Sequence, residues 1–365
     1  MSRRIEQQSG LDCIKPYVPG KPIEDVKREY GLDDVIKLAS NENPLGVSPK
    51  ALAAMTAALP RLSQYPDAAS YEFRSALAQH YDVDMAQVAV GNGADDLILE
   101  LSMAYLEDGD EVVVSKSSFP MYDVHAMAMR ATLVKTPLTS ALCIDLNAMA
   151  DAITERTKLV YVCNPNNPTG TIVEAEAVDA FIARVPEHVL IVLDEAYVEM
   201  VDSDAFPDSL DYVRQGRENI FVMRTFSKVY GLAGIRVGYG FAHERIVSTL
   251  MKIKPPFNVN VLAQAAGIAA LTDSEFVAQS VTANKIGRNY LCREFDRLGL
   301  CYAPSHTNFV LVHIGPPASG IQQQLVEKGV IVRPCGGYDL PEYLRVSIGT
   351  AAQNERFIQT LSEIL

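Results

Sequence analysis

Residues 220–236 read IFVMRTFSKVYGLAGIR, and this stretch decides the fold because it joins an apolar run to a polar, glycine-containing turn. The apolar run predicts a buried strand that ends where Thr225 and Ser227 begin the turn. Taken alone, this segment is also compatible with an exposed lysine after a strand. If Lys228 is buried, its ammonium form is disfavoured and its pKa is lowered, and a neutral lysine is the form that condenses with an aldehyde. The hydroxyls of Thr225 and Ser227, with the guanidinium of Arg236, predict a phosphate site beside it.

A second segment places rigid amides after a predicted strand. Asn164-Pro165-Asn166-Asn167-Pro168-Thr169-Gly170 follows the apolar run at 158–163. Its turn residues predict a loop, which is its plainest interpretation. However, asparagines held between prolines also present their side-chain amides at the carboxyl end of a parallel strand, where open α/β sheets bind ligands.

A third segment places a carboxylate at a strand tip. Residues 189–193 are five consecutive apolar residues, which predict a strand buried on both faces, and Asp194 follows them. A buried carboxylate needs a cationic partner, and a pyridinium nitrogen would supply one. Aldehyde, phosphate and pyridinium together describe pyridoxal 5′-phosphate, whose ring accepts electrons while its nitrogen is protonated. Tyr197 would then donate its phenol to the ring oxygen.

These three segments resemble the class I and II aminotransferases, which have the α/β fold called fold type I and use pyridoxal phosphate. The resemblance implies catalytic roles for Lys228, Asp194 and Tyr197. It also implies that the cofactor is bound by Gly93, Ala94, Asp95, Phe119, Asn167, Asp194, Tyr197, Thr225, Ser227, Lys228 and Arg236. In this family Lys228 holds the cofactor covalently and then moves a proton between the substrate α-carbon and the cofactor.

Further segments narrow the resemblance to the histidinol-phosphate aminotransferases, and it covers nearly the whole chain. The marks are residues 15–20 (KPYVPG), 38–46 (LASNENPLG), 64–67 (QYPD), 91–96 (GNGADD), 329–334 (GVIVRP) and 343–350 (YLRVSIGT). The implied reaction moves the amino group of L-histidinol phosphate to 2-oxoglutarate. Aromatic amino-acid aminotransferases and threonine-phosphate decarboxylases share several of these marks, so both stay open as alternatives.

The resemblance also assigns substrate contacts and an assembly. It implies that Tyr17, Asn43, Arg333 and Arg345 bind substrate. Arg345 lies in an alternating strand and projects to one face, and a planar guanidinium pairs bidentately with either a carboxylate or a phosphate. The family forms homodimers with shared active sites, in which Tyr65 would reach the cofactor phosphate of the other subunit.

Two further candidates lie after other predicted strands. Gly91-Asn92-Gly93-Ala94-Asp95 follows a strand and opens a helix, so its free amides predict a phosphate cradle as well as an ordinary loop. It lacks the dinucleotide fingerprint, because Asp96 stands where the last glycine would be. Phe119 occupies the family position whose ring stacks on the cofactor, although a core aromatic is the plainer interpretation.

Alternating strand-like and helix-like runs predict an α/β fold. Strands are expected near 87–90, 111–114, 132–135, 158–163, 189–193, 220–224 and 236–241, giving a mostly parallel seven-stranded sheet between helices. The short link between the last two predicts one antiparallel edge. A smaller α/β domain is expected after a hinge near 255–262. The expected domains are therefore 46–261, and 1–45 with 262–365.

The composition is that of an ordinary soluble globular protein. The chain has 365 residues, 48% apolar and 21% charged, which suits two domains. A net charge of −13 argues against nucleic acid as a partner. Six cysteines without C-x-x-C pairs predict reduced thiols and, with no leader or membrane segment evident, a cytoplasmic enzyme. Six scattered histidines predict no metal site.

Overall fold

The computed structural model describes residues 5–16 and 20–365. The larger of two sheets has the order β2-β8-β7-β6-β5-β3-β4. Its strands are β2 Val88–Gly91, β3 Glu111–Ser115, β4 Thr132–Thr136, β5 Thr157–Cys163, β6 Leu190–Asp194, β7 Ile220–Thr225 and β8 Gly238–Ala242. Every residue of β5, β6 and β7 except Lys158 is buried, as expected for central parallel strands with both faces covered. The mostly parallel seven-stranded sheet is therefore confirmed.

The antiparallel strand was predicted at an edge, and that position is wrong. β8 does pair antiparallel with β7, but its other side pairs antiparallel with β2. β8 is therefore an interior strand, and the edges are β2 and β4. The short link between β7 and β8 revealed the direction of the pairing, whereas the docking of β2 depends on contacts more than a hundred residues apart in the chain.

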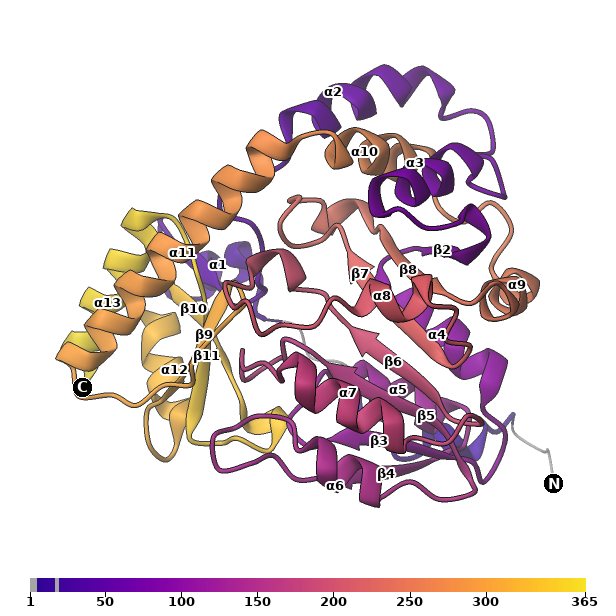
Figure 1. The fold of residues 1–365 in the computed structure, drawn as a ribbon. Coiled ribbons are helices and arrows are strands. Elements are labelled where there is room, and N and C mark those ends of the chain that lie inside the picture. Colours follow the sequence, from indigo (N-terminus) through magenta and orange to yellow (C-terminus); the bar gives the residue numbers. More distant parts are fainter. Residues whose placement is uncertain (1–4, 17–19) are drawn as a thin grey trace.

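Helices cover both faces of this sheet and extend beyond one edge (Figure 1). The helices are α2 Pro49–Ala58, α3 Tyr71–Tyr81, α4 Ala94–Tyr105, α5 Met121–Ala128, α6 Leu146–Asp151, α7 Ala175–Arg184, α8 Ser209–Arg214, α9 Glu244–Ile253, α10 Val261–Leu271 and α11 Ser274–Arg297. Short 3-10 turns lie at Ser9–Leu11, Leu59–Arg61, Met85–Gln87, Val198–Met200, Ala233–Ile235 and Gly336–Tyr338.

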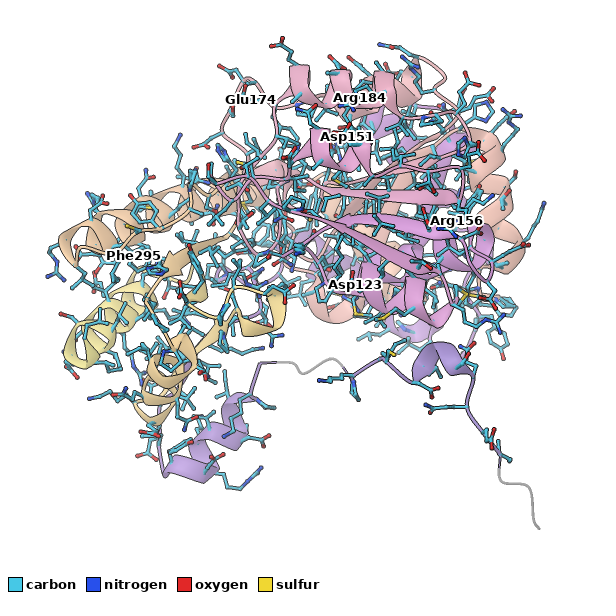
Figure 2. All side chains as sticks on the ribbon, turned by 90° about the horizontal axis from the view of Figure 1, so that it is seen from below. Asp123, Asp151, Arg156, Glu174, Arg184 and Phe295 are labelled. Carbon is cyan, nitrogen blue, oxygen red and sulfur yellow. The ribbon has the colours of Figure 1, made fainter. Side chains whose placement is uncertain are left out.

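A second, four-stranded sheet has the order β1-β10-β11-β9. Its strands are β1 Ile36–Leu38, β9 Phe309–His313, β10 Val330–Pro334 and β11 Tyr343–Ser347, and its helices are α1 Ile23–Tyr30, α12 Ala318–Glu327 and α13 Ala351–Ile364. β1 pairs parallel with β10, so the N-terminal segment joins the C-terminal unit. This sheet has its own core, which contains Phe295 (Figure 2).

Helix α11 connects the two cores. Val277 and Val281 near its start pack against the core of the large sheet, whereas Leu291 and Phe295 belong to the core of the small sheet. Figure 1 shows this helix running from α10 to lie beside α13. Helix α10, which follows the predicted hinge, is buried in the core of the large sheet through Ala263 and its neighbours. The predicted domain boundaries therefore stay a prediction.

Within the described residues, no single helix is long and apolar enough to cross a membrane. Helices α10 and α11 together satisfy the length and composition required, but they are bent by 81° where they meet.

Candidate active site

The carboxyl ends of the central strands open onto a cavity of about 340 Å³. Because β5, β6 and β7 are parallel, residues that follow them in the sequence meet at one edge of the sheet. The predicted residues that line this cavity are Ala94, Asp95, Phe119, Asn167, Asp194, Tyr197, Thr225, Ser227, Lys228, Arg236 and Arg345. Residues from segments far apart in the sequence therefore converge on one space.

Asp194, the last residue of β6, is a buried carboxylate with an exposed fraction of 4%. Its Oδ2 accepts a hydrogen bond from the hydroxyl of Tyr122, and its Oδ1 accepts one from the amide of Ala196 at 3.1 Å. Burial raises the pKa of Asp194 to about 6, although the hydrogen bonds from Tyr122 and Ala196 oppose that rise. Tyr122 is itself fixed by stacking on Tyr161. The strand therefore ends in a carboxylate that a buried cation would stabilise.

Lys228 faces the same cavity from the turn after β7. Burial lowers the pKa of its amine to about 8, and the positive charge of Arg345 lowers it further. No described residue forms an ion pair with Lys228, and its Nζ lies 5.4 Å from the centre of the Tyr197 ring. A lysine in this state loses its proton near neutral pH, which a nucleophile or base requires.

The start of α4 lies close to β8 and to the guanidinium of Arg236, an arrangement of donors that suits a phosphate group. Gly93 has a φ of +91°, and a Cβ there would lie 2.3 Å from Nη2 of Arg236. A Cβ on Gly238 would lie 2.3 Å from the amide nitrogen of Ala94. Two glycines thus let the helix N-terminus, β8 and a guanidinium approach one another closely. Thr225 donates to Ser227 at 2.9 Å, which brings both hydroxyls to the same end of the cavity.

These groups fit pyridoxal phosphate. The phosphate would lie in the cradle made by Ala94, Asp95, Thr225, Ser227 and Arg236, within reach of the same cavity that holds Lys228 and Asp194. Asp194 would receive the protonated ring nitrogen, and Lys228 the aldehyde carbon. Such a ligand would offset the cost of burying both groups. It supplies a cation that pairs with the carboxylate of Asp194 and an electrophile that bonds to the neutral amine of Lys228.

Arg345 is a buried cation, 4% exposed, that lies on β11 and lines the cavity. Its Nη1 donates to Oδ1 of Asn167, and its Nη2 donates to the carbonyl of Ala39 at 2.9 Å. Its Nε has no hydrogen-bond partner among the described residues, and no carboxylate of the described chain pairs with it. A buried guanidinium with neutral acceptors only is suited to binding an anion.

The remaining predicted residues lie elsewhere. The side-chain nitrogen of Asn43 donates to Val229 and Ser280 at 2.8 and 2.9 Å, outside the cavity lining. Tyr65 is 80% exposed and stacks on Phe257 at 4.3 Å. Arg333 lies opposite Arg345 in the pair of β10 and β11, and faces the ring of Tyr338, which lines the cavity. Tyr17 falls outside the described residues. The roles of all four stay predictions.

Residues that contact the predicted ones were missed in the sequence, and three of them are polar side chains. Tyr122 holds Asp194, Asn41 contacts Tyr197, and Tyr338 lies beside Arg345. Tyr122 comes one helical turn after Phe119, but nothing in the sequence shows that α5 faces the tip of β6. Asn41 lies in the same quoted segment as Asn43, and the sequence does not show which of the two faces the ligand.

No group of three or more His, Cys, Asp or Glu side chains suited to a metal ion occurs among the described residues. The nearest approach to a titratable cluster joins Asp202 to Arg288, Lys285 and His306, where three nitrogens surround one carboxylate. The expectation that the protein needs no metal stays a prediction.

The fold and this site define an enzyme that works through an aldehyde cofactor carrying a phosphate. A family described as aminotransferase class I and II matches residues 33–361. The chain therefore belongs to the class I and II aminotransferases, and the family that the sequence predicted is confirmed.

Individual relatives are similar over nearly their full length. The chain is 50% identical to a histidinol-phosphate aminotransferase of Moorella thermoacetica, covering 96% of this chain and 91% of the relative. It is 43% identical to histidinol-phosphate aminotransferase 2 of Carboxydothermus hydrogenoformans, covering 98% and 99%. Among solved structures, the histidinol-phosphate aminotransferase of Sinorhizobium meliloti in complex with pyridoxal 5′-phosphate matches with a TM-score of 0.88 and 30% identity, covering 98% and 100%.

The raised pKa of Asp194 predicts that this residue weakens the fold of the cofactor-free protein. Its folded pKa of about 6 exceeds the ordinary value of 3.8, so ionisation costs stability as pH rises from about 4 through 6. We expect Asp194→Asn to raise the free energy of unfolding of cofactor-free protein at pH 7, by on the order of 2 kcal/mol. The gain should vanish below about pH 4, where the wild-type carboxyl is protonated in both states.

Chemical denaturation across this pH range checks the expectation, with Asp151→Asn as the control. Asp151 is an exposed carboxylate paired with Arg184, and exposed ion pairs contribute little to stability, so its replacement should change the free energy of unfolding little. The same Asp194→Asn change should reduce turnover of the cofactor-loaded enzyme by several orders of magnitude, because an amide does not favour a protonated ring nitrogen. Equal pH dependence in Asp194→Asn and wild type would show that the carboxyl is not destabilised by burial.

Proposed function

We propose that this chain transfers the amino group of L-histidinol phosphate to 2-oxoglutarate with pyridoxal phosphate, giving imidazole acetol phosphate and L-glutamate, a step of histidine biosynthesis. The observation that carries the proposal is the buried Arg345, whose guanidinium faces the same cavity as Lys228 and Asp194. Histidinol phosphate has no α-carboxylate, so one site must accept a phosphate in one half-reaction and a carboxylate in the other. A planar guanidinium accepts both geometries.

Each residue at the cavity then has a chemical task. Pyridoxal phosphate supplies an aldehyde that holds the substrate amine and a ring that accepts the electron pair of the α-carbon. Lys228 would hold the cofactor covalently, and its free amine would move a proton between the substrate α-carbon and the cofactor carbon C4′. Its pKa of about 8 lies near neutral pH, where a base can both take and return a proton.

The other cavity residues orient and stabilise the cofactor. Asp194 would keep the ring nitrogen protonated, and Phe119, which lines the same cavity, would stack on the ring. Tyr197 and Asn167 hydrogen-bond the ring oxygen. Because Arg345 donates to Oδ1 of Asn167, the nitrogen end of that amide is the end left to donate to the cofactor. The cradle at Gly93, with Ala94, Asp95, Thr225, Ser227 and Arg236, binds the phosphate.

The experiment that tests this proposal follows the visible absorbance of the bound cofactor in a single half-reaction. Pyridoxal phosphate-loaded protein is mixed with L-histidinol phosphate, histidinol, phenylalanine or threonine phosphate. We expect histidinol phosphate to bleach the band fastest, because it alone supplies both the imidazole and the anion. Equal rates with histidinol or phenylalanine would favour an aromatic amino-acid aminotransferase, and release of CO₂ from threonine phosphate would favour a decarboxylase.

Arg345 and Arg333 are expected to contribute differently to binding of the two substrate anions. Arg345→Ala should slow the half-reactions of both histidinol phosphate and glutamate by roughly 10–100-fold, as loss of a charged hydrogen bond predicts. We also propose that Arg333 and Tyr17 bind the phosphate, so Arg333→Ala should slow histidinol phosphate more than glutamate. Arg184→Ala, which removes an exposed arginine paired with Asp151, is the matched control. Equal losses for both donors in Arg333→Ala would remove its assigned role.

We further propose a homodimer in which Tyr65 reaches the cofactor phosphate of the other subunit. Tyr65 is largely exposed and does not line the cavity of its own subunit. Several large apolar side chains are exposed near Tyr65 in the sequence, and Phe257, which stacks on Tyr65, is exposed as well. These side chains are Leu45, Val47, Leu52, Leu59, Leu62 and Phe257. A two-fold interface would bury these groups and create two equivalent sites.

Mixed dimers test the sharing of sites. Co-expressed Tyr65→Ala and Lys228→Ala chains should regain activity, because half of the sites in a mixed dimer carry neither change. A monomer in sedimentation, or an inactive mixed dimer, would contradict the proposal.

We also propose a cytoplasmic location without nucleic-acid or membrane partners. All six cysteines are free, as is usual in a reducing compartment, and the net charge of −13 opposes binding to polyanions. Recovery of the native protein from a membrane or periplasmic fraction would contradict this location.

A further inference from the structure

Asn41 has a backbone that is held from both sides and a side chain that lines the cavity. Its amide N–H donates to Oγ of Ser347 at 2.9 Å, and its carbonyl accepts from Nδ2 of Asn308 at 2.9 Å. Its φ is +55°, a left-handed conformation that asparagine tolerates better than most side chains. The residue is 2% exposed. Position and direction of its amide are therefore fixed by the four-stranded unit.

The hydrogen bonds around Asn41 determine which end of its side-chain amide accepts and which end donates. Ser347 receives the main-chain N–H of Asn41 and donates its own proton to Oδ1 of Asn41 at 2.8 Å. The amide oxygen is thereby used as an acceptor, and Nδ2 is directed to the hydroxyl oxygen of Tyr197 at 3.0 Å. Since Nδ2 is only a donor, Tyr197 must accept this hydrogen bond.

A phenol that accepts a hydrogen bond still has its own proton to donate elsewhere. Tyr197 is 3% exposed, and burial raises its pKa, so that it keeps this proton. Its ring is set edge-on to Phe309 with centroids 5.3 Å apart, and it lines the cavity beside Lys228. With Asn41 on one side of the oxygen, the proton of Tyr197 is left for the cavity.

We propose that Asn41 is a positioning residue that commits the Tyr197 proton to the ring oxygen of pyridoxal phosphate. The inference rests on the proposed function, since it requires that cofactor. The hydrogen bond from Asn41 to Tyr197 joins the two units of the fold, because Asn41 and Ser347 belong to the four-stranded unit and Tyr197 follows β6 of the large sheet. The placement of the small unit thereby affects the charge on the cofactor.

The test is a pH titration of the visible band of the bound cofactor. When the bound chromophore loses its proton, the ring oxygen carries more negative charge, which a hydrogen-bond donor stabilises. Loss of that donor should therefore raise the midpoint. Tyr197→Phe and Asn41→Asp should each raise it by about one unit or more. The carboxylate introduced by Asn41→Asp would accept the phenol proton and so reverse the direction of the bond. Asn41→Gly accepts the same φ and should raise the midpoint by less.

Double variants separate this role from a structural one. In a Tyr197→Phe background, Asn41→Gly should cause no further shift, and Asn41→Asp should add only the effect of its charge. Ser347→Ala frees the amide to turn and should give a smaller rise. Asn147→Asp, which adds a charge at an exposed asparagine bonded to Arg184, should match wild type. A packing role alone would instead make the isosteric Asn41→Asp milder than Asn41→Gly.

The outcomes distinguish this inference from the proposed function. A wild-type protein that shows no visible band with pyridoxal phosphate would overturn the proposed function itself. A band whose midpoint is unchanged in Asn41→Asp would overturn the inference alone. The inference would also be overturned if the midpoint shifts of Asn41→Gly and Tyr197→Phe were additive in the double variant. Thermal unfolding of each variant, measured with cofactor bound, shows whether a failure to bind comes from loss of the fold.

Discussion

Two ionisable groups that share one cavity, the buried Asp194 and the partly exposed Lys228, are the constraint on which the rest of the structure depends. Burial disfavours the charge of each group, so that it raises the pKa of Asp194 to about 6 and lowers the pKa of Lys228 to about 8. A ligand that brings a cation to the acid and an electrophile to the lysine offsets the cost of burying both charges. The parallel sheet makes this possible, because the ends of neighbouring strands place both groups at one edge, where Asp194 is buried and Lys228 is partly exposed to the cavity.

The four-stranded unit completes the cavity from the other side. Arg345 reaches Asn167 of the large unit, and Asn41 reaches Tyr197, so each unit orients a side chain of the other. A change in the placement of one unit would therefore alter both the anion site and the hydrogen bond to the cofactor. The N-terminal segment takes part because β1 pairs with β10, which fixes Asn41 beside β11. Binding of substrate and the electronic state of the cofactor thus depend on the same contacts.

Strand ends and turn residues allowed most of the cavity to be predicted from the sequence. Asp194, Asn167 and Lys228 each follow an apolar run, so local patterns locate them and a parallel sheet brings them together. Residues that act through long-range packing escaped prediction. Tyr122 contacts Asp194 because of how α5 lies on the sheet, and β8 became an interior strand because distant β2 docks on it. Local periodicity contains no information on either contact.

The central claim is that Lys228 is the one lysine that bonds to pyridoxal phosphate. Reduction of the loaded protein with borohydride, followed by peptide mass mapping, tests it most directly, because reduction makes the bond between lysine and cofactor permanent. The account predicts one pyridoxyl group per chain, on the peptide that contains Lys228, and none in a Lys228→Ala variant that still unfolds cooperatively. A pyridoxyl group on another lysine, or an unmodified Lys228 in fully loaded wild-type protein, would contradict it.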